Sequence, residues 1–261
     1  MNYIELLGIS ASGKTTLKKK LTKKSKKKIY DKKYIIINFY ICNYKINLIH
    51  YLKSMSLLFL SSKISMKMKP KIRKTGIIFK SQKKTIFVNN KRNSMLKLLD
   101  YFGTDNYYST ILELLAKKLR LNKNNLFKIA MDEIKNLNQN TYFKKKLKRW
   151  FLENIVIYEI QRKHNQNFCI NDEGLIQTLF VIFKFSRKKN TFINNVIRNF
   201  KQHGKLFILS YNPKKIMYRS KKRRKFKDGY IYKDLKEVYK EIHDFEIFKK
   251  YTKNKIKYVG F

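Results

Sequence analysis

Short apolar runs alternate with helical apolar stripes along the chain, and this order predicts an α/β fold. The runs are rich in aliphatic and aromatic residues, and they fall at residues 3–7, 34–41, 168–171, 205–211 and near 255–260. The run 34–41 is almost continuously apolar, which is typical of a strand covered on both faces of a parallel sheet. Strands that alternate with helices at both ends of the chain indicate a parallel sheet wrapped by helices.

Helical spacing of apolar residues marks the segments between these runs. Leu17 and Leu21 lie one helical turn apart, directly after the first run. Further stripes fall at residues 111–119, 126–137 and 143–158, and helices are expected near 174–186, 191–202 and 231–250. Pro213 suits the first position of another helix, where its missing N–H costs little. Residues 45–100 are less regular, and we expect helices near 48–60 and 92–101 with loop or short strand between them.

Length and composition are those of a globular protein with a well-buried core. The chain has 261 residues, of which 43% are hydrophobic, and only 8 are Gly and 2 are Pro, so no interdomain linker is evident. Cys42 and Cys169 both lie in apolar, strand-like runs, and we expect buried, reduced thiols. No signal peptide is visible and no apolar run reaches about 18 residues, so the expectation is a cytoplasmic protein without a membrane span.

The charge balance is strongly basic, with 62 Lys and Arg against 17 Asp and Glu, a formal net charge of +45. Such a field favours nucleic acid, anionic membranes or polyanionic substrates. The chain is also crowded with Asn and Ile, a pattern typical of drift in an AT-biased genome. We favour drift as the main cause. Nucleic-acid binding through the Lys-rich segments 18–28 and 219–227 is the open alternative.

Residues 8–15 read G-x-x-x-x-G-K-T directly after the first apolar run, where a strand passes through a glycine loop into a helix. Backbone N–H groups of such a loop, together with the helix N-terminus, bind phosphate oxygens. In this motif Lys14 reaches the β- and γ-phosphates, and the Thr15 hydroxyl binds Mg²⁺. The sequence therefore predicts an ATP–Mg²⁺ site; its predicted nucleotide-binding residues are Gly8, Ser10, Ala11, Ser12, Gly13, Lys14, Thr15 and Thr16.

A carboxylate at the tip of a neighbouring strand would complete the metal site. Asp172 ends the run 168–171, which would bring it to the carboxyl edge of a parallel sheet, where ligands bind. We expect Asp172 to hold Mg²⁺ together with Thr15. Glu173 follows, and it could take a proton from an acceptor hydroxyl, orient a water molecule or cap the next helix.

A third candidate element is the basic segment that follows Pro213. Arg219 and Arg223 lie four residues apart, on one helical face. Phosphoryl transfer spreads negative charge over the moving group, and guanidinium groups match that charge. We therefore predict catalytic roles for Lys14, Glu173, Arg219 and Arg223, while a solvated basic helix end is the alternative for the two arginines.

Three segments in this order resemble the P-loop nucleotide and nucleoside kinase-like proteins, most closely the thymidylate-kinase-like branch. They are the opening stretch through Thr16, Asn-Asp-Glu-Gly-Leu-Ile-Gln at 171–177, and Asn-Pro-x5-Arg-x3-Arg at 212–223. The resemblance implies a P-loop NTPase fold with a five-stranded parallel sheet, ATP with Mg²⁺, and a mobile basic lid. It carries nucleotide and metal roles to Lys14, Thr15 and Asp172.

The chain departs from the family pattern on the acceptor side. It lacks the Asp-Arg or Glu-Arg signature that places an acceptor in true nucleotide kinases, and Asn212 stands where many relatives have an acid. We therefore expect a single domain over 1–261, with its core at 1–44 and 166–261 and a helical acceptor-side insertion at 45–165. The predicted function is an ATP-dependent phosphotransferase with an unknown small-molecule acceptor. An ATPase that drives a partner and a nucleotide-regulated nucleic-acid-binding protein are the alternatives.

Overall fold

The computed structural model describes most of the chain, in two compact units. The described residues are 3–25, 29–44, 50–55, 57, 69–73, 76–80, 85–88, 104–164, 168–209, 212–224 and 232–260. One unit combines residues 1–29 with 119–261, and the other spans residues 30–118. The assignment of residues 45–165 to a single acceptor-side insertion stays a prediction.

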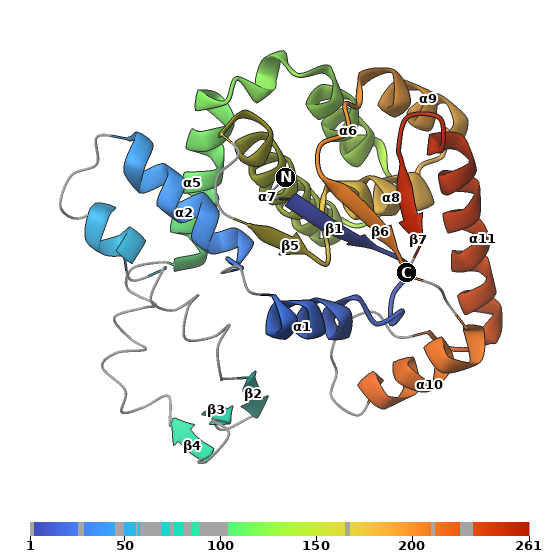
Figure 1. The fold of residues 1–261 in the computed structure, drawn as a ribbon, viewed down its shortest axis with the longest axis horizontal. Helices are drawn as coiled ribbons and strands as arrows, with labels where there is room; N and C mark the ends of the chain where they lie inside the picture. Colours follow the sequence, from blue (N-terminus) through green and yellow to red (C-terminus); the bar gives the residue numbers. More distant parts are fainter. Residues whose placement is uncertain are drawn as a thin grey trace. The chain divides into compact units, whose positions relative to one another are not determined.

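A parallel sheet of four strands forms the centre of the larger unit (Figure 1). The strands run in the order β5–β1–β6–β7, and every neighbouring pair is parallel. Their bounds are Tyr3–Leu7 for β1, Cys169–Asn171 for β5, Lys205–Ile208 for β6 and Tyr258–Gly260 for β7. The α/β class and the parallel sheet are therefore confirmed, but the sheet has four strands in the described chain, where five were expected.

Helices surround this sheet at the positions that the apolar stripes predict. Their bounds are Lys14–Lys24 for α1, Asn125–Asn136 for α6, Thr141–His164 for α7, Leu175–Phe185 for α8, Lys189–Asn199 for α9, Pro213–Arg224 for α10 and Leu235–Thr252 for α11, with a short 3₁₀ helix at Leu121–Lys123. Pro213 is the first residue of α10, as expected. In the described part of the chain, no helix is both long enough and apolar enough to cross a bilayer.

Side chains of β1 alternate between two layers of helices, as the pleat of a strand requires. Ile4 and Leu6 pack in a cluster with Leu17 and Leu21 of α1. On the opposite face, the ring of Tyr3 contacts an aromatic ring of α7, and Glu5 accepts a hydrogen bond from the backbone of α8. The sheet is therefore covered on both faces, and this holds the end of β1 firmly between helices.

The smaller unit corrects one sequence prediction. Residues 34–41 were expected to form a strand, but they lie inside helix α2, Lys32–Asn43. Asp31 caps this helix, because its side chain accepts a hydrogen bond from the Lys33 N–H at 2.9 Å. A continuous apolar run suits a buried helix as well as a buried strand, so periodicity could not separate the two. Cys42 lies on α2 and is exposed, contrary to the expectation, whereas Cys169 is buried.

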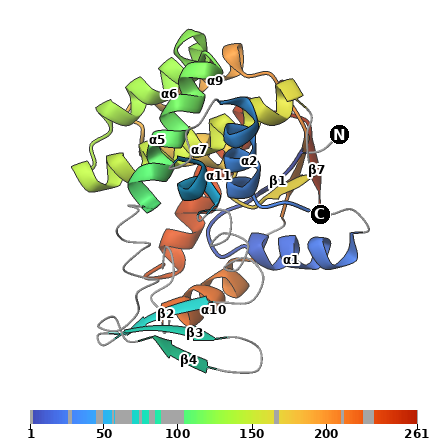
Figure 2. The ribbon, with the colours of Figure 1, turned by 90° about the vertical axis from the view of Figure 1, so that its left-hand side faces the viewer.

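The described residues of the smaller unit also include helix α5, Thr104–Lys118, and three short strands. The strands are β2 at Lys69–Arg73, β3 at Gly76–Lys80 and β4 at Thr85–Val88, and they pair antiparallel in chain order (Figure 2). Residues 50–55 are helical, within the predicted helix near 48–60. The other predicted helix, near 92–101, lies outside the described residues.

Candidate nucleotide-binding site

The loop between β1 and α1 has a backbone that requires glycine. Gly8 and Gly13 adopt φ angles of +152° and +108°. A Cβ on Gly8 would lie 2.8 Å from Ser12 Oγ, and one on Gly13 would lie 3.0 Å from Arg219 Nη1. Ala11 also has a positive φ, 60°, which is uncommon for a residue with a side chain and is typical of functional loops. The tight loop thus requires glycine at positions 8 and 13, the two glycine positions of the motif.

The loop passes into α1 with a glycine at the N-cap. Gly13 is the N-cap residue, and glycine has no side chain that could cap the helix. The first turn of a helix carries N–H groups without intrahelical partners and the positive end of the helix dipole. An anion placed against Gly13 would therefore meet both favourable features.

Lys14 extends along the loop. Its Nζ donates hydrogen bonds to the carbonyl oxygen of Gly8 at 2.5 Å and to that of Ile9 at 3.0 Å. The ammonium group therefore lies against the start of the loop, and its phosphate-binding role stays a prediction. The Ser12 hydroxyl of the same loop is buried, and its Oγ has no hydrogen-bond partner among the described residues. A buried, unpaired hydroxyl is costly unless a partner reaches it.

Asp172 meets the loop across the sheet. It follows β5, which pairs with β1, so the carboxyl ends of the two strands lie at the same edge. Thr15 Oγ1 donates a hydrogen bond to Asp172 Oδ2 at 2.9 Å, and Lys18 Nζ lies 3.1 Å from Asp172 Oδ1. Burial raises the pKa of the Asp172 carboxyl, but the Lys18 ammonium and the Thr15 hydroxyl outweigh burial, so the pKa lies below its usual range. The carboxylate is therefore ionised near neutral pH.

The donors at this edge fit a magnesium ion. Thr15 and Asp172 provide a hydroxyl and a carboxylate, the hard oxygen ligands that Mg²⁺ prefers. The described residues contain no group of three or more His, Cys, Asp or Glu side chains that could form a complete metal cage. Mg²⁺ in phosphoryl-transfer sites is commonly held by one or two protein oxygens together with substrate phosphates, so a two-residue set suffices.

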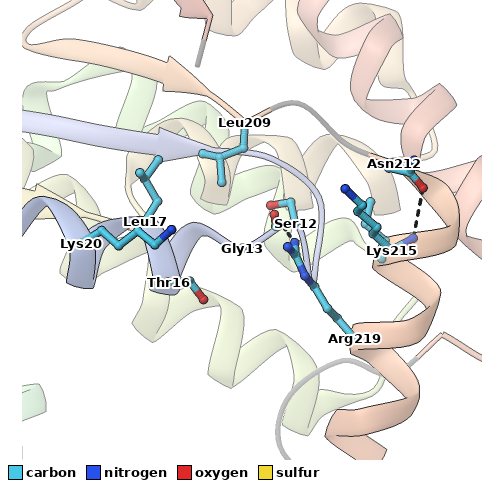
Figure 3. A pocket seen from close by; sticks show the side chains of 10 residues that line it. Ser12, Gly13, Thr16, Leu17, Lys20, Leu209, Asn212, Lys215 and Arg219 are labelled. Atoms are coloured by element: carbon cyan, nitrogen blue, oxygen red, sulfur yellow. Dashed lines mark hydrogen bonds between the residues drawn. The ribbon is translucent and has the colours of Figure 1, made fainter.

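Arg219 reaches the loop from α10. Its Nη1 donates to the carbonyl oxygens of Ser12 at 2.8 Å and of Ala11 at 3.4 Å, and Figure 3 shows its side chain directed toward the loop. Arg223 is also part of α10, but its side chain lies outside the described residues. Asn212 caps this helix, because its Oδ1 accepts from the Lys215 N–H at 3.1 Å. The structure thus brings one of the two predicted arginines to the loop.

A cavity of about 310 Å³ opens beside the loop, between α1 and the start of α10 (Figure 3). Its lining combines small and apolar residues with cationic ones: Ser12, Gly13, Thr16, Leu17, Lys20, Leu209, Asn212, Lys215, Ile216 and Arg219. Thr16, predicted from the motif, is among them. A lining of apolar and cationic side chains suits a ligand that has an apolar body and a negative charge.

Sequence reasoning missed a buried acid that supports the loop from behind. Glu5 on β1 is fully buried, and its Oε1 accepts from the Gln177 N–H at 2.9 Å, near the start of α8. Gln177 Oε1 in turn accepts from the Gly8 N–H at 3.2 Å. Burial raises the pKa of Glu5 to about 7, against the effect of the backbone N–H groups and the Tyr3 hydroxyl. Glu5 of β1 therefore binds the backbone of Gln177 in α8, and the side chain of Gln177 binds Gly8, the first residue of the loop.

Gly174 makes room for this buried acid. A Cβ at position 174 would lie 2.3 Å from Glu5 Cδ, so only glycine fits. Gly174 is the N-cap of α8 and has no side-chain cap of its own, and the Glu5 carboxylate serves that helix end instead. Glu173, the predicted base or cap, is exposed, and its backbone N–H donates to Asn171 Oδ1 at 3.1 Å. Glu5 thus caps α8 in place of Glu173, and the catalytic role of Glu173 stays a prediction.

Two residues near α11 hold the middle of the loop. Glu241 Oε1 accepts from the Ser10 N–H at 3.2 Å, and the Tyr232 hydroxyl donates to the Ser10 carbonyl at 3.4 Å. Glu241 also forms an ion pair with Lys184 of α8. No sequence signal could have placed these side chains, because they lie more than 200 positions from Ser10 and belong to no motif.

Comparisons with known proteins add no relative. The sequence matches no family model and no curated protein, and no solved structure matches the fold. The resemblance to kinase-like proteins therefore rests on the sequence motifs alone.

Proposed function

We propose that the chain is an ATP-dependent phosphotransferase that binds ATP with Mg²⁺ through the loop 8–15. The observation that carries the proposal is the contact between Thr15 Oγ1 and Asp172 Oδ2, at 2.9 Å. These residues are 157 positions apart. The glycine-loop motif predicted Thr15 as a magnesium ligand, and the position of Asp172 at the end of the apolar run 168–171 predicted the second ligand. A glycine turn with an ordinary surface lysine would give no reason for a strand-end carboxylate to meet the loop threonine.

Each residue of the site has a role that its position supports. The N-terminus of α1 and the Lys14 ammonium would bind the phosphates, and the magnesium held by Thr15 and Asp172 would neutralise their charge. Arg219 contacts the loop from α10 and would stabilise the charge that spreads over the phosphoryl group during transfer. Arg223 is assigned a role in the same lid-like helix, α10, because of its position in that helix.

The cavity beside α1 supports a nucleoside triphosphate over a simple phosphate. It adjoins Gly13 and Thr16, and it adds the apolar side chains of Leu17 and Ile216 to the phosphate site. A planar base and sugar would bury apolar surface there, while the cationic side chains of the lining would bind the phosphates. The acceptor is a small molecule that bears a hydroxyl or a phosphate group. Glu173, exposed beside Asp172, is proposed as the group that takes its proton.

The test is a screen of nucleosides, nucleotides and sugars as acceptors, with ATP labelled on its γ-phosphate. Label should pass to one acceptor class, and Lys14→Ala and Asp172→Asn should each lower the rate by about 100-fold or more, since charge stabilisation dominates this chemistry. Lys19→Ala, an exposed lysine of the same helix, is the matched control and should leave the rate unchanged. Full activity in both site variants would contradict the proposed site.

The same screen separates the alternatives. Steady hydrolysis of ATP that no acceptor stimulates would identify an ATPase, in which Glu173 would orient a water molecule. Binding to single- or double-stranded nucleic acid that persists at physiological salt and responds to ATP would identify a nucleic-acid-binding protein. Purely electrostatic binding falls steeply with salt.

A further inference from the structure

Both oxygens of the Asp172 carboxylate already have a partner within the chain. Oδ2 accepts a hydrogen bond from Thr15, and Oδ1 lies 3.1 Å from the Nζ of Lys18. The two charged side chains are well shielded from solvent, with 24% of Lys18 and 18% of Asp172 exposed. Ion pairs that are removed from water in this way interact more strongly than exposed pairs.

The geometry of α1 explains why Lys18 reaches this carboxylate. Lys18 lies three positions after Thr15 and four after Lys14, so the three side chains share one face of the helix. The next residue, Lys19, belongs to the same helix but is exposed. A lysine-rich helix therefore directs one particular ammonium group at the proposed metal ligand.

We propose that Lys18 is a built-in counterion of Asp172 that competes with Mg²⁺ for this carboxylate, and that it thereby sets how strongly nucleotide binding depends on the metal. The inference rests on the proposed function, because it takes Asp172 as the magnesium ligand. It assigns to Lys18 a role that differs from the phosphate-binding role of Lys14.

The physical reason is that one carboxylate serves two cations. Without Mg²⁺, Lys18 neutralises Asp172 and reduces its repulsion of the incoming phosphates. With Mg²⁺, the metal must share or displace the ammonium, so part of its binding free energy is lost. Lys18 should therefore favour the metal-free nucleotide and disfavour the metal-bound one. Because such coupling is reciprocal, the same effect appears as a higher magnesium requirement.

Lys18→Met tests the proposal by removing the charge while keeping a long, unbranched side chain. The measurement is the equilibrium Kd of a fluorescent ATP analogue, with EDTA and over a titration of Mg²⁺, with no acceptor and no turnover. Loss of one partly buried charge partner should raise the ratio of the metal-free to the metal-bound Kd by about tenfold, and lower the Mg²⁺ midpoint correspondingly. Lys18→Arg, which keeps the charge, should restore most of the wild-type ratio.

Lys19→Met is the matched control, since it removes the same charge from an exposed position of the same helix. Its ratio should stay within about twofold of the wild-type value, because exposed charges are screened by solvent and salt. In an Asp172→Asn background, Lys18→Met should no longer change the ratio, because no carboxylate is left for the two cations to compete for.

The outcomes separate this inference from the function on which it rests. If the wild-type chain binds no nucleotide, or Asp172→Asn leaves the magnesium dependence unchanged, then the proposed metal site is wrong. If wild-type binding depends on Mg²⁺ and Asp172 but Lys18→Met behaves as Lys19→Met does, then only the competition is refuted. Weaker binding of the metal-bound nucleotide by Lys18→Met, with an unchanged or smaller ratio, would also overturn it, since Lys18 would then merely hold Asp172 in place.

Discussion

Replacing Glu5 with Gln should change how the stability of the protein depends on pH. Burial raises the pKa of Glu5 from its ordinary value of 4.5 to about 7. Between these pH values the folded chain keeps a proton that the unfolded chain loses, so unfolding becomes easier as the pH rises. The stability that this proton contributes is present below about pH 4.5, and about 3 kcal/mol of it is lost by pH 7, since one pKa unit corresponds to about 1.4 kcal/mol.

Gln at position 5 carries no such proton, yet its side-chain oxygen can still accept from the Gln177 N–H. The Tyr3 hydroxyl, which donates to Glu5 Oε2 at 3.2 Å, can turn and accept from the new amide. Glu5→Gln should therefore fold, lack the decline in stability, and exceed the wild-type protein in stability at pH 8. The free energy of unfolding is measured by urea denaturation at pH 5, 6, 7 and 8.

Glu133→Gln on α6 makes the same chemical change at a half-buried position and serves as the control. Its pH profile should follow the wild-type profile. Parallel wild-type and Glu5→Gln profiles across this range would show that burial does not shift the pKa of Glu5, because Glu5 would then ionise equally in the folded and unfolded chains. A marked loss of stability in Glu5→Gln at every pH would show that the capping bond to α8 needs a carboxylate.

Two further predictions follow from burial and close contacts. Gly174→Ala should destabilise the protein by roughly 2 kcal/mol or more in urea denaturation, because its Cβ would lie 2.3 Å from Glu5 Cδ, and this cost should fall in a Glu5→Ala background. In the native protein a thiol reagent should label Cys42, which is exposed, and should reach the buried Cys169 only in urea; equal native labelling of both would contradict the fold around β5.

The parts of the site that sequence predicted are those that local chemistry encodes. Glycine spacing, Lys14 and Thr15 form a contiguous motif, and Asp172 follows a short apolar run at a strand end. These signals depend on residues close together in the chain. The pairing of parallel strands then places both segments at one edge, so a simple topological rule sufficed to predict the meeting of Thr15 and Asp172.

The supporting residues could not be predicted, because their roles depend on tertiary contacts. Glu5 sits within an apolar strand, and only the approach of α8 turns it into a helix cap. Lys18 is one of several lysines on α1, and its sequence neighbours give no sign that it alone meets Asp172. Glu241 acts on Ser10 from a helix near the other end of the chain.

The wrong prediction of a strand at 34–41 has a different cause. An unbroken apolar run indicates burial on all sides but not the period of the backbone, so length and capping must decide. Asp31 at the N-cap was the available signal, and it identifies the helix that the structure contains. With that segment helical, the expected fifth strand is absent from the sheet in the described chain.

Direct equilibrium binding tests most simply whether the loop 8–15 binds the phosphates of ATP. Labelled ATP with Mg²⁺, titrated against the wild-type chain at physiological salt, should occupy one saturable site, and Lys14→Ala should abolish binding while keeping the wild-type unfolding profile. No saturable binding by the wild-type chain, or equal binding by a folded Lys14→Ala variant, would contradict the account.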